Sequence, residues 1–198
     1  GKKNMQIVIA SSNKGKLSEL SALLSPLGHK LIAQDELAIP ASPETGLSFV
    51  ENALQKARAT SKQAKLPCIA DDSGLVVEAL NGKPGIMSAR YAGKDNDAQK
   101  NNEKLLTALK DVGDRSAYFY CCIVFINHSL DPTPKIGMGR WEGKIATKNY
   151  GFEGFGYDPI FFIPNLNRTA AELTAEEKNR ISHRGQAAKS LCEQLRKK

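Results

Sequence analysis

The chain has 198 residues, 41% of them hydrophobic and 25% charged, a balance that indicates a globular protein with a buried core and excludes a disordered chain. Its 28 lysines and arginines exceed its 21 aspartates and glutamates, and the resulting charge of +7 favours a partner that carries phosphate. No apolar run reaches the roughly 18 residues that span a bilayer. We therefore expect a soluble, cytoplasmic protein in which residues 1–198 form a single domain.

The first half of the chain predicts strands that alternate with helices. Residues 1–4 precede Met5 and are expected to be an artificial remnant. Met5 to Ala10 is a β-branched run that predicts a strand, and leucines at helical spacing after Gly15 predict a helix. The next predicted elements are a strand over 29–33, a Pro-rich loop over 38–46, an amphipathic helix over 48–64 and a buried strand over 67–70.

The second half predicts a pair of long strands and a helical end. Asp95 or Asp97 is expected to cap a helix, residues 117–127 and 135–146 predict a hairpin, and residues 160–163 predict another strand. Two Thr-x-x-Glu capping boxes, at residues 169–172 and 174–177, precede the last helix. The whole pattern predicts an α/β fold in which helices flank a mixed β-sheet. The four cysteines lack metal or redox spacing, so we expect reduced, mostly buried thiols.

A polar loop joins the first predicted strand to the first predicted helix, and it consists of Ser11, Ser12, Asn13, Lys14, Gly15 and Lys16. Free backbone N–H groups and the helix dipole favour an anion there, and Lys16 adds a mobile charge, which suits a triphosphate. The loop is not a Walker A motif, because Ala10 and Leu17 stand where that motif needs a glycine and a hydroxyl. An ordinary polar loop with Asn13 as helix cap explains the pattern equally well.

Asp71 and Asp72 follow the predicted strand over 67–70, so two adjacent carboxylates are expected at a strand end, where ligand sites of α/β sheets gather. Neighbouring strand residues point to opposite faces, so we expect one of the two to face the site. Magnesium accepts one aspartate, a distant glutamate and substrate phosphates as ligands, and Glu44 and Glu51 are the nearest candidates. A plain turn before Gly74 is the alternative.

Glycines bracket the aromatic residues of the segment over 154–159, and the segment ends on a rigid Asp158-Pro159 pair. Such a loop brings backbone close to a flat ligand, with Phe155 stacked on a base and Asp158 at the base edge. A tight turn whose Phe155 and Tyr157 fill the core is equally compatible with the sequence.

His183 and Arg184 open the last predicted helix, where a helix N-terminus, an imidazole and a guanidinium favour an anion or a carbonyl oxygen. A solvated helix start is the ordinary alternative, and Lys178 and Arg180 are compatible with plain surface charge. No Gly-x-Ser-x-Gly nucleophile motif is present, which disfavours acyl transfer.

Taken together, these segments resemble the family of inosine triphosphate pyrophosphatases, also called XTP/dITP diphosphatases. The match covers nearly the whole chain from Met5, and each short motif occurs in the family's order. The motifs are Ser11 to Lys16, Glu44-Thr45-Gly46, Phe49 to Ala53, Ala70 to Gly74, Pro84-Gly85-Ile86, Ser88 to Tyr91, Gly154 to Phe161, Ala171-Glu172-Leu173, Lys178 and Ser182 to Gly185. The chain departs from the family pattern at Ser11-Ser12, at Met87 and at Pro43, where some members have a second acid.

The resemblance implies an elongated α/β fold whose two lobes frame a nucleotide cleft, a Mg²⁺ requirement and a homodimer. It implies that Glu44 and Asp72 hold magnesium, with Asp72 as the proton acceptor. It implies phosphate contacts from Ser11 to Lys16 and from Lys56, with Ser73 on the phosphate or sugar. The implied base pocket consists of Phe155, Gly156, Tyr157, Asp158, Lys178, His183 and Arg184.

The implied reaction is hydrolysis of ITP, dITP and XTP to the monophosphate and pyrophosphate, which removes these nucleotides before their incorporation into DNA and RNA. Asp72 would deprotonate the attacking water, while Lys16 and Lys56 offset charge on the leaving pyrophosphate. Hydrogen-bond donors at the base edge suit the 6-oxo group of hypoxanthine and xanthine and oppose the 6-amino group of adenine.

Two other functions fit part of the pattern. The charge of +7 and the terminal Lys197-Lys198 suggest a nucleic-acid-binding module, but such a module needs basic residues beside exposed aromatics, whereas the aromatics here lie in apolar runs. We therefore expect neither a nucleic acid nor a membrane as partner. A related pyrophosphatase for methylated or pyrimidine triphosphates is the closer alternative, and the sequence separates it poorly.

Overall fold

The computed structural model describes residues 4–196, so most of the expected N-terminal remnant, and Lys197 and Lys198, lie outside the described residues. Its α-helices are α1 (Lys14–Leu24), α2 (Phe49–Ala64), α3 (Ala98–Ala108), α4 (Ala175–Ile181) and α5 (His183–Arg196). Its strands are β1 (Gln6–Ile9), β2 (Lys30–Ala33), β3 (Cys68–Val77), β4 (Ser116–Ile126), β5 (Lys135–Ile145), β6 (Phe161–Ile163) and β7 (Arg168–Thr169).

The strands form a mixed sheet in the order β2-β1-β3-β4-β5-β6-β7. Strand β1 pairs in parallel with β2 and with β3, where Val8 lies opposite Cys68. Strand β6 pairs antiparallel with β5 and with β7. The predicted α/β fold with a mixed sheet and flanking helices is therefore confirmed.

The chain forms two compact units. The first contains the described residues up to Asp72, Cys121–Gly139 and the residues from Arg184 onward, and the second contains Ser73–Tyr120 and Arg140–His183. Strands β3, β4 and β5 each begin in one unit and end in the other, so each long strand contributes residues to two cores.

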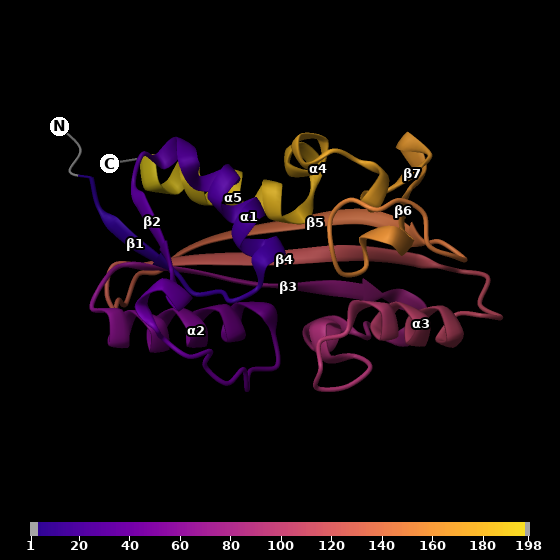
Figure 1. The fold of residues 1–198 in the computed structure, drawn as a ribbon, viewed down its shortest axis with the longest axis horizontal. Coiled ribbons are helices and arrows are strands. Elements are labelled where there is room, and N and C mark those ends of the chain that lie inside the picture. Colours follow the sequence, from indigo (N-terminus) through magenta and orange to yellow (C-terminus); the bar gives the residue numbers. More distant parts are fainter. Residues whose placement is uncertain (1–3, 197–198) are drawn as a thin grey trace. The chain divides into compact units, whose positions relative to one another are not determined.

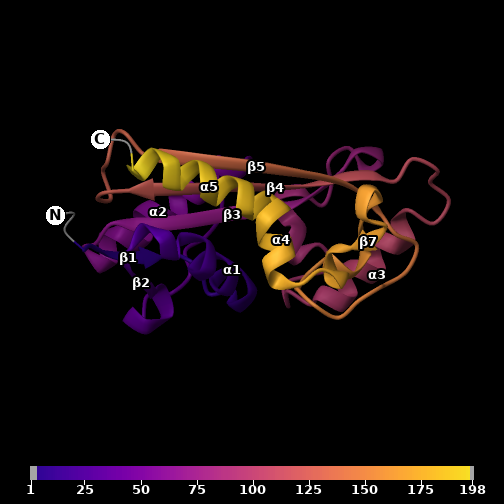
Figure 2. The same ribbon diagram turned by 90° about the horizontal axis from the view of Figure 1, so that it is seen from above.

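In the first unit, α1 and α5 lie on one face of the strands and α2 lies on the other (Figure 1). Leucines of α1 and apolar residues of α5 pack on β1 and on the first-unit parts of β3 and β4; the members include Ile7, Ile9, Leu20, Leu24, Ile69, Ile123, Ala187 and Leu191. Helix α5 runs along β5 (Figure 2), and a Cβ atom at Gly137 would stand 2.2 Å from the carbonyl oxygen of Ala187.

The second unit has its own core, to which α3, the second-unit parts of β3, β4 and β5, and the segment that follows β5 contribute apolar side chains. It combines aliphatic residues with four aromatic ones, and its members include Leu75, Leu105, Leu109, Phe119, Trp141, Tyr157, Ile160, Phe161 and Leu173. Burying several aromatic side chains together stabilises a small unit strongly, because each removes a large apolar area from water.

Polar side chains start the helices where the sequence predicts. Asn13, Ser48 and Asp97 accept hydrogen bonds from the backbone at the starts of α1, α2 and α3. Both predicted capping boxes are present, at Thr169–Glu172 and at Thr174–Glu177. The caps supply partners to N–H groups that a helix start leaves unpaired.

Strand β3 is longer than predicted. The sequence predicts a strand that ends before Asp71, whereas β3 continues to Val77 with both aspartates inside it. The predicted strand-end site and the alternative of a turn are both wrong. The apolar run Leu75-Val76-Val77, with two β-branched valines, follows Gly74 and extends the strand.

The structure of residues 4–196 tests two expectations, one on membrane-spanning helices and one on the cysteines. Within that range, no helix has both the length and the apolar character that crossing a bilayer requires. All four cysteines are buried free thiols, as predicted.

Candidate active site

Asp71 and Asp72 are neighbours in β3, and each has its own set of cations. Lys16 Nζ lies 2.8 Å from Asp71 Oδ1, and Arg184 Nε lies 3.3 Å from Asp71 Oδ2. The thiol of Cys121 donates to the same Oδ2 at 2.9 Å. The Asp71 carboxylate is therefore the centre of a buried ionic cluster, and its side chain has no exposed surface.

The cluster extends to α1 through Arg184, which lies at the start of α5. Arg184 Nη1 donates to Glu19 Oε1 at 2.6 Å, while its Nε contacts Asp71. Glu19 follows Lys16 by three residues, so the two side chains share a face of α1. The solvated helix start that the sequence left open is wrong, because only 4% of His183 and 2% of Arg184 are exposed.

Electrostatics keep this cluster ionised. Burial alone would raise the pKa of Asp71, but Lys16 and Arg184 outweigh it and hold that pKa far below its ordinary value. Burial likewise opposes the charge on Lys16, and the attraction of Asp71 nevertheless raises the pKa of Lys16. Lys16 is thus not the mobile charge that the loop sequence suggests, since its ammonium is fixed against Asp71.

Asp72 has the opposite electrostatic character. Lys56 Nζ lies 4.0 Å from Asp72 Oδ1, 3.2 Å from Glu44 Oε1 and 2.6 Å from the carbonyl oxygen of Asp71, to which it donates. Burial raises the pKa of Asp72 to about 6, although Lys56 and Lys16 oppose the rise. The two adjacent aspartates therefore lie in opposite electrostatic environments.

The Oδ2 atom of Asp72 is buried and has no hydrogen-bond partner within residues 4–196. A buried carboxylate oxygen without a partner is costly, so it marks a place where a water, a cation or a ligand group is required. Glu44 is half-buried, lies on the loop before α2, and contacts the same ammonium as Asp72. The two carboxylates, which come from distant segments, are therefore brought to one ammonium group.

A divalent cation fits this donor set. In the described part of the chain, no three His, Cys, Asp or Glu side chains gather in a way that would hold a metal by themselves. Magnesium does not require such a group, because it keeps several waters and accepts one or two carboxylates together with substrate phosphates. The unpartnered Asp72 oxygen and the partly exposed Glu44 carboxylate satisfy that requirement.

Other carboxylates that the sequence offers as ligands are engaged elsewhere. Glu51 accepts from the Ser48 hydroxyl at 2.8 Å and from the Leu47 N–H at 3.4 Å. Asp71 is occupied by the ionic cluster.

Ser73 follows Asp72 in β3 and is partly exposed.

The loop before α1 presents polar groups to solvent. Ser12, Asn13 and Lys14 are exposed, and Ser11, Gly15 and Lys16 are partly exposed. Asn13 Oδ1 caps α1 by accepting from the N–H of Lys16 at 3.0 Å. The capping role that the sequence allows for Asn13 is therefore present, and α1 begins at Lys14 inside the predicted loop.

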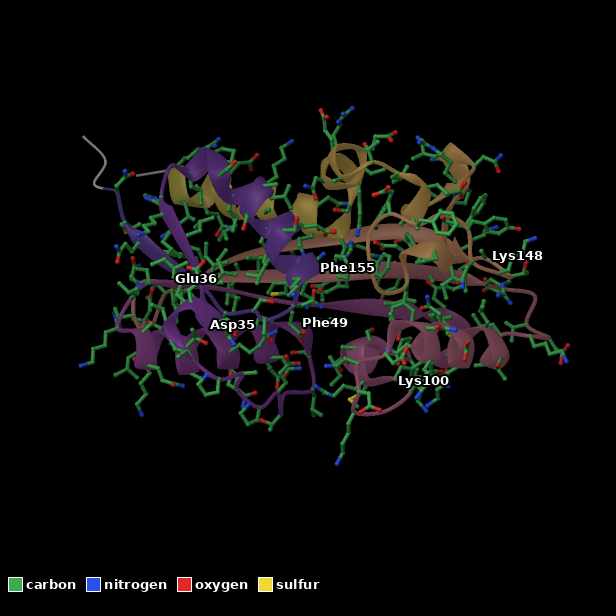
Figure 3. The ribbon with its side chains drawn as sticks, viewed as in Figure 1. Asp35, Glu36, Phe49, Lys100, Lys148 and Phe155 are labelled. Carbon is green, nitrogen blue, oxygen red and sulfur yellow. The ribbon has the colours of Figure 1, made fainter. Side chains whose placement is uncertain are left out.

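In the second unit, Phe155 lies in the loop between β5 and β6 (Figure 3). Its N–H donates to Asp158 Oδ2 at 2.9 Å. Lys178 Nζ, from α4, lies 2.5 Å from that oxygen and 4.6 Å from the centre of the Phe155 ring. Gly154 has φ +71°, and a Cβ there would stand 2.1 Å from Asp158 Oδ2. Lys178 is buried, so the alternative of surface charge is wrong for it.

Tyr157 and Gly156 fix the remainder of this loop. The Tyr157 hydroxyl donates to the carbonyl oxygen of Ser88 at 2.6 Å, and Asn102 Nδ2 donates to the carbonyl oxygen of Gly156 at 3.1 Å. Tyr157 is buried and belongs to the core, as one interpretation of the sequence predicts, whereas Phe155 is partly exposed. Of Phe155 and Tyr157, Phe155 is thus the one that keeps exposed surface for a ligand.

His183 is stacked against aromatic rings of the same unit. Its ring lies 4.6 Å from that of Phe119 at an angle of 12°, and 6.1 Å from that of Trp141 at 17°. Stacking against two nearly parallel rings restricts the orientation of the imidazole. Its orientation is therefore set by the core.

The residues that sequence reasoning missed are supporting ones: Glu19, Ser88, Asn102, Phe119, Cys121 and Trp141. Glu19 carried a signal, since it shares a helical face with Lys16. For the others, each contact joins segments distant in sequence, as with Cys121 and Asp71, which are 50 positions apart. No local pattern in the chain predicts such a pair.

Comparison with known proteins gives consistent matches over nearly the whole chain. Residues 7–194 match the model of the Ham1 family. The dITP/XTP pyrophosphatase of Shigella flexneri is 54% identical over 193 residues, which are 96% of this chain and 98% of that protein. The solved HAM1 protein of Coxiella burnetii is 51% identical with a TM-score of 0.89, covering 96% of this chain and 98% of its own. The solved Ham1 protein of Staphylococcus aureus is 43% identical with a TM-score of 0.85, and the match covers 96% of this chain and 97% of that protein.

Proposed function

Because the chain belongs to the Ham1 family, we propose that it hydrolyses ITP, dITP and XTP to the monophosphate and pyrophosphate, and so keeps these nucleotides out of DNA and RNA. The similarity to proteins named dITP/XTP pyrophosphatase supports this activity, since it extends over nearly the full length of both chains. The structural observation that carries the proposal is Asp72, a buried carboxylate with an unpartnered oxygen beside Lys56 and Glu44.

We assign Mg²⁺ as the cofactor, with Glu44 and Asp72 as the residues that hold it. Hard oxygen donors suit this ion, and the two carboxylates leave room for waters and phosphate oxygens. When bound, the ion neutralises charge on phosphate oxygens and acidifies a bound water. Lys56 contacts Glu44 and lies near Asp72, so it balances both carboxylates where the ion is absent.

Asp72 is assigned as the proton acceptor. A general base works best when its pKa is near the operating pH, and burial raises the pKa of Asp72 to about 6. Asp71, its neighbour, is unsuited to this role because Lys16 and Arg184 stabilise its charged form. Proton transfer to Asp72 needs no covalent intermediate.

The phosphate groups are assigned to the start of α1 and to two lysines. The residues are Ser11, Ser12, Asn13, Lys14, Gly15, Lys16 and Lys56. The N-terminus of α1 offers backbone N–H groups and a favourable dipole. The Lys16 ammonium is held in place by Asp71, so little entropy is lost when it meets an anion. Ser73 is assigned to the phosphate or sugar.

The base is assigned to Phe155, Gly156, Tyr157, Asp158, Lys178, His183 and Arg184. The exposed part of the Phe155 ring suits stacking on a flat purine. Two nitrogens of Arg184 are bound by Glu19 and Asp71, which limits the directions in which it donates. Donors that face a 6-oxo group are left unpaired by the 6-amino group of adenine, at a cost of about 1–3 kcal/mol each.

We further propose a cytoplasmic homodimer. Four free, buried thiols are compatible with a reducing compartment. Support for the dimer is the family resemblance alone, and analytical ultracentrifugation tests it directly by a mass twice that of the chain.

The test of the function is pyrophosphate release from ITP, XTP, dITP, GTP, ATP and dTTP in parallel, with Mg²⁺ or with EDTA. We expect fast release from the first three only, and no release with EDTA. Equal rates of release from all six nucleotides would contradict the specificity for ITP, dITP and XTP. An unchanged rate in EDTA would contradict the metal requirement.

A further inference from the structure

The loop that carries Glu44 contacts α2 residue by residue. Three consecutive loop residues contact three residues on one face of the helix; the pairs are Glu44 with Lys56, Thr45 with Gln55, and Gly46 with Asn52. The helix residues are spaced by three and four positions from Asn52, which places them on one side of α2.

The contact between Thr45 and Gln55 consists of two hydrogen bonds. The N–H of Thr45 donates to Gln55 Oε1 at 2.9 Å, and Gln55 Nε2 donates to the Thr45 hydroxyl oxygen at 3.0 Å. The side-chain amide thus uses both its acceptor and its donor on a single residue. Such a two-point contact restrains the position and the rotation of the peptide that follows Glu44.

The contact between Gly46 and Asn52 fixes the next residue. The N–H of Gly46 donates to Asn52 Oδ1 at 2.7 Å, and Asn52 is only 1% exposed. The approach is close, because a Cβ atom at Gly46 would stand 2.8 Å from Asn52 Oδ1 and 2.7 Å from the Cβ of Glu51. The loop therefore lies directly on the first turns of α2 at this point.

The loop needs these contacts, since it has no regular structure of its own. Residues 39–46 form neither helix nor strand, and Pro40 and Pro43 lack backbone donors. A free loop of this kind loses about 1–2 kcal/mol of conformational entropy for each residue that becomes ordered. The amides of Gln55 and Asn52 supply part of the compensation at the two residues that follow Glu44.

The ion pair with Lys56 is unsuited to present Glu44 to a cation, because an ammonium and a metal ion compete for the same carboxylate oxygens. The amides of Gln55 and Asn52 act differently. They bind the backbone and the Thr45 hydroxyl, and leave the Glu44 carboxylate itself available.

We propose that Gln55 and Asn52 are positioning residues that hold Glu44 where it ligates a divalent cation. The inference rests on the proposed function, in which Glu44 is a metal ligand. It adds that the affinity for the metal depends on two uncharged side chains of α2 that do not touch the metal.

The experiment uses Mn²⁺ alone, titrated into the full chain without nucleotide and followed by electron paramagnetic resonance. Gln55→Leu removes both hydrogen bonds to Thr45 and is expected to weaken Mn²⁺ binding about five- to tenfold. The matched control is Gln63→Leu, the same substitution at an exposed position of the same helix, which should bind Mn²⁺ like the unaltered chain. Thr45→Val tests the contact from the loop side, and Thr45→Ser, which keeps the hydroxyl, should restore most of the affinity.

A thermodynamic cycle with Glu44→Gln separates positioning from general stability. If Gln55 acts through Glu44, then Gln55→Leu has no further effect on Mn²⁺ affinity once Glu44→Gln is present. Unaltered Mn²⁺ affinity in both Gln55→Leu and Thr45→Val would overturn the positioning role, as would an additive effect in the cycle or an equal loss in Gln63→Leu.

The same variants also show whether a negative result refutes Glu44 as a metal ligand or only the positioning role. If Glu44→Gln leaves Mn²⁺ affinity unchanged, then Glu44 is not a ligand, and both the assignment and the positioning role are overturned. If Glu44→Gln weakens binding while Gln55→Leu and Thr45→Val do not, then only the positioning role is overturned.

Discussion

Lys178 and Asp158 form a buried ion pair in which Nζ lies 2.5 Å from Oδ2. Removing one partner leaves an uncompensated charge in a dry site, so Lys178→Met is expected to lower the free energy of unfolding by about 3–5 kcal/mol. Urea denaturation measures this loss. The double variant Lys178→Met with Asp158→Asn has no orphaned charge and should be more stable than the single one; equal stability of the two would contradict the argument.

Asp72→Asn separates chemistry from stability. The amide has the shape of the carboxylate but accepts no proton at neutral pH, so pyrophosphate release from ITP should be abolished. Because burial disfavours the charge on Asp72, the variant should unfold in EDTA at the same urea concentration as the unaltered chain or a higher one. Turnover near the normal rate would remove Asp72 as the base.

Gly154 and Gly156 make a matched pair, since both have positive φ values, +71° and +61°. An alanine Cβ at Gly154 meets Asp158 Oδ2, whereas nothing lies within 4 Å of a Cβ at Gly156. Gly156→Ala should therefore cost only the conformational strain, about 1 kcal/mol, and Gly154→Ala should cost about 1–3 kcal/mol more. Gly154→Ala should also raise KM for ITP more than Gly156→Ala, because it displaces the contacts that hold Phe155.

The turn between β4 and β5 should make the protein sensitive to acid. Asp131 accepts from the N–H groups of Asn127 and Thr133 at 2.8 and 2.9 Å, and these bonds lower its pKa to about 2. A lowered pKa in the folded state means that the carboxylate stabilises the fold above pH about 4, and that this contribution is lost as the pH falls towards 2.

Asp131→Asn tests that dependence. At pH 7 the variant should be less stable by about 1–3 kcal/mol, because hydrogen bonds to a charged acceptor are replaced by neutral ones. The difference from the unaltered chain should narrow as the pH falls from 4 to 2, measured by thermal unfolding. A difference that stays constant over this range would show that the charge of Asp131 does not matter.

Local sequence patterns predicted most elements because the signals are local. Helix caps, leucine spacing and β-branched runs act over three to seven residues, and they indicated the existence of α1, the starts of α2 and α3, and the positions of β4 and β5. The exception is β3, where two aspartates and a glycine suggested that the strand ends.

That exception has a physical reason. A strand tolerates two buried aspartates only where cations compensate them, and Lys16, Lys56 and Arg184 come from three other segments. The sequence of residues 68–77 does not indicate that these cations lie nearby. For the same reason the sequence suggested a role for Lys16 and Arg184 but not their link through Asp71. The contacts of Asn102 with Gly156 and of Trp141 with His183 also join distant segments, and no local pattern predicted them.

The salt link between Asp71 and Arg184 joins residues that are 113 positions apart, one in β3 and the other in the last helix. A ribosome delivers the chain from its N-terminus, so Asp71 emerges long before its guanidinium partner has been translated. Lys16, Lys56 and Cys121 all precede Arg184 in the chain, so the nascent chain has every other partner of this cluster before α5 supplies the guanidinium. The charge of Asp71 is thus fully balanced only after the final helix has been translated.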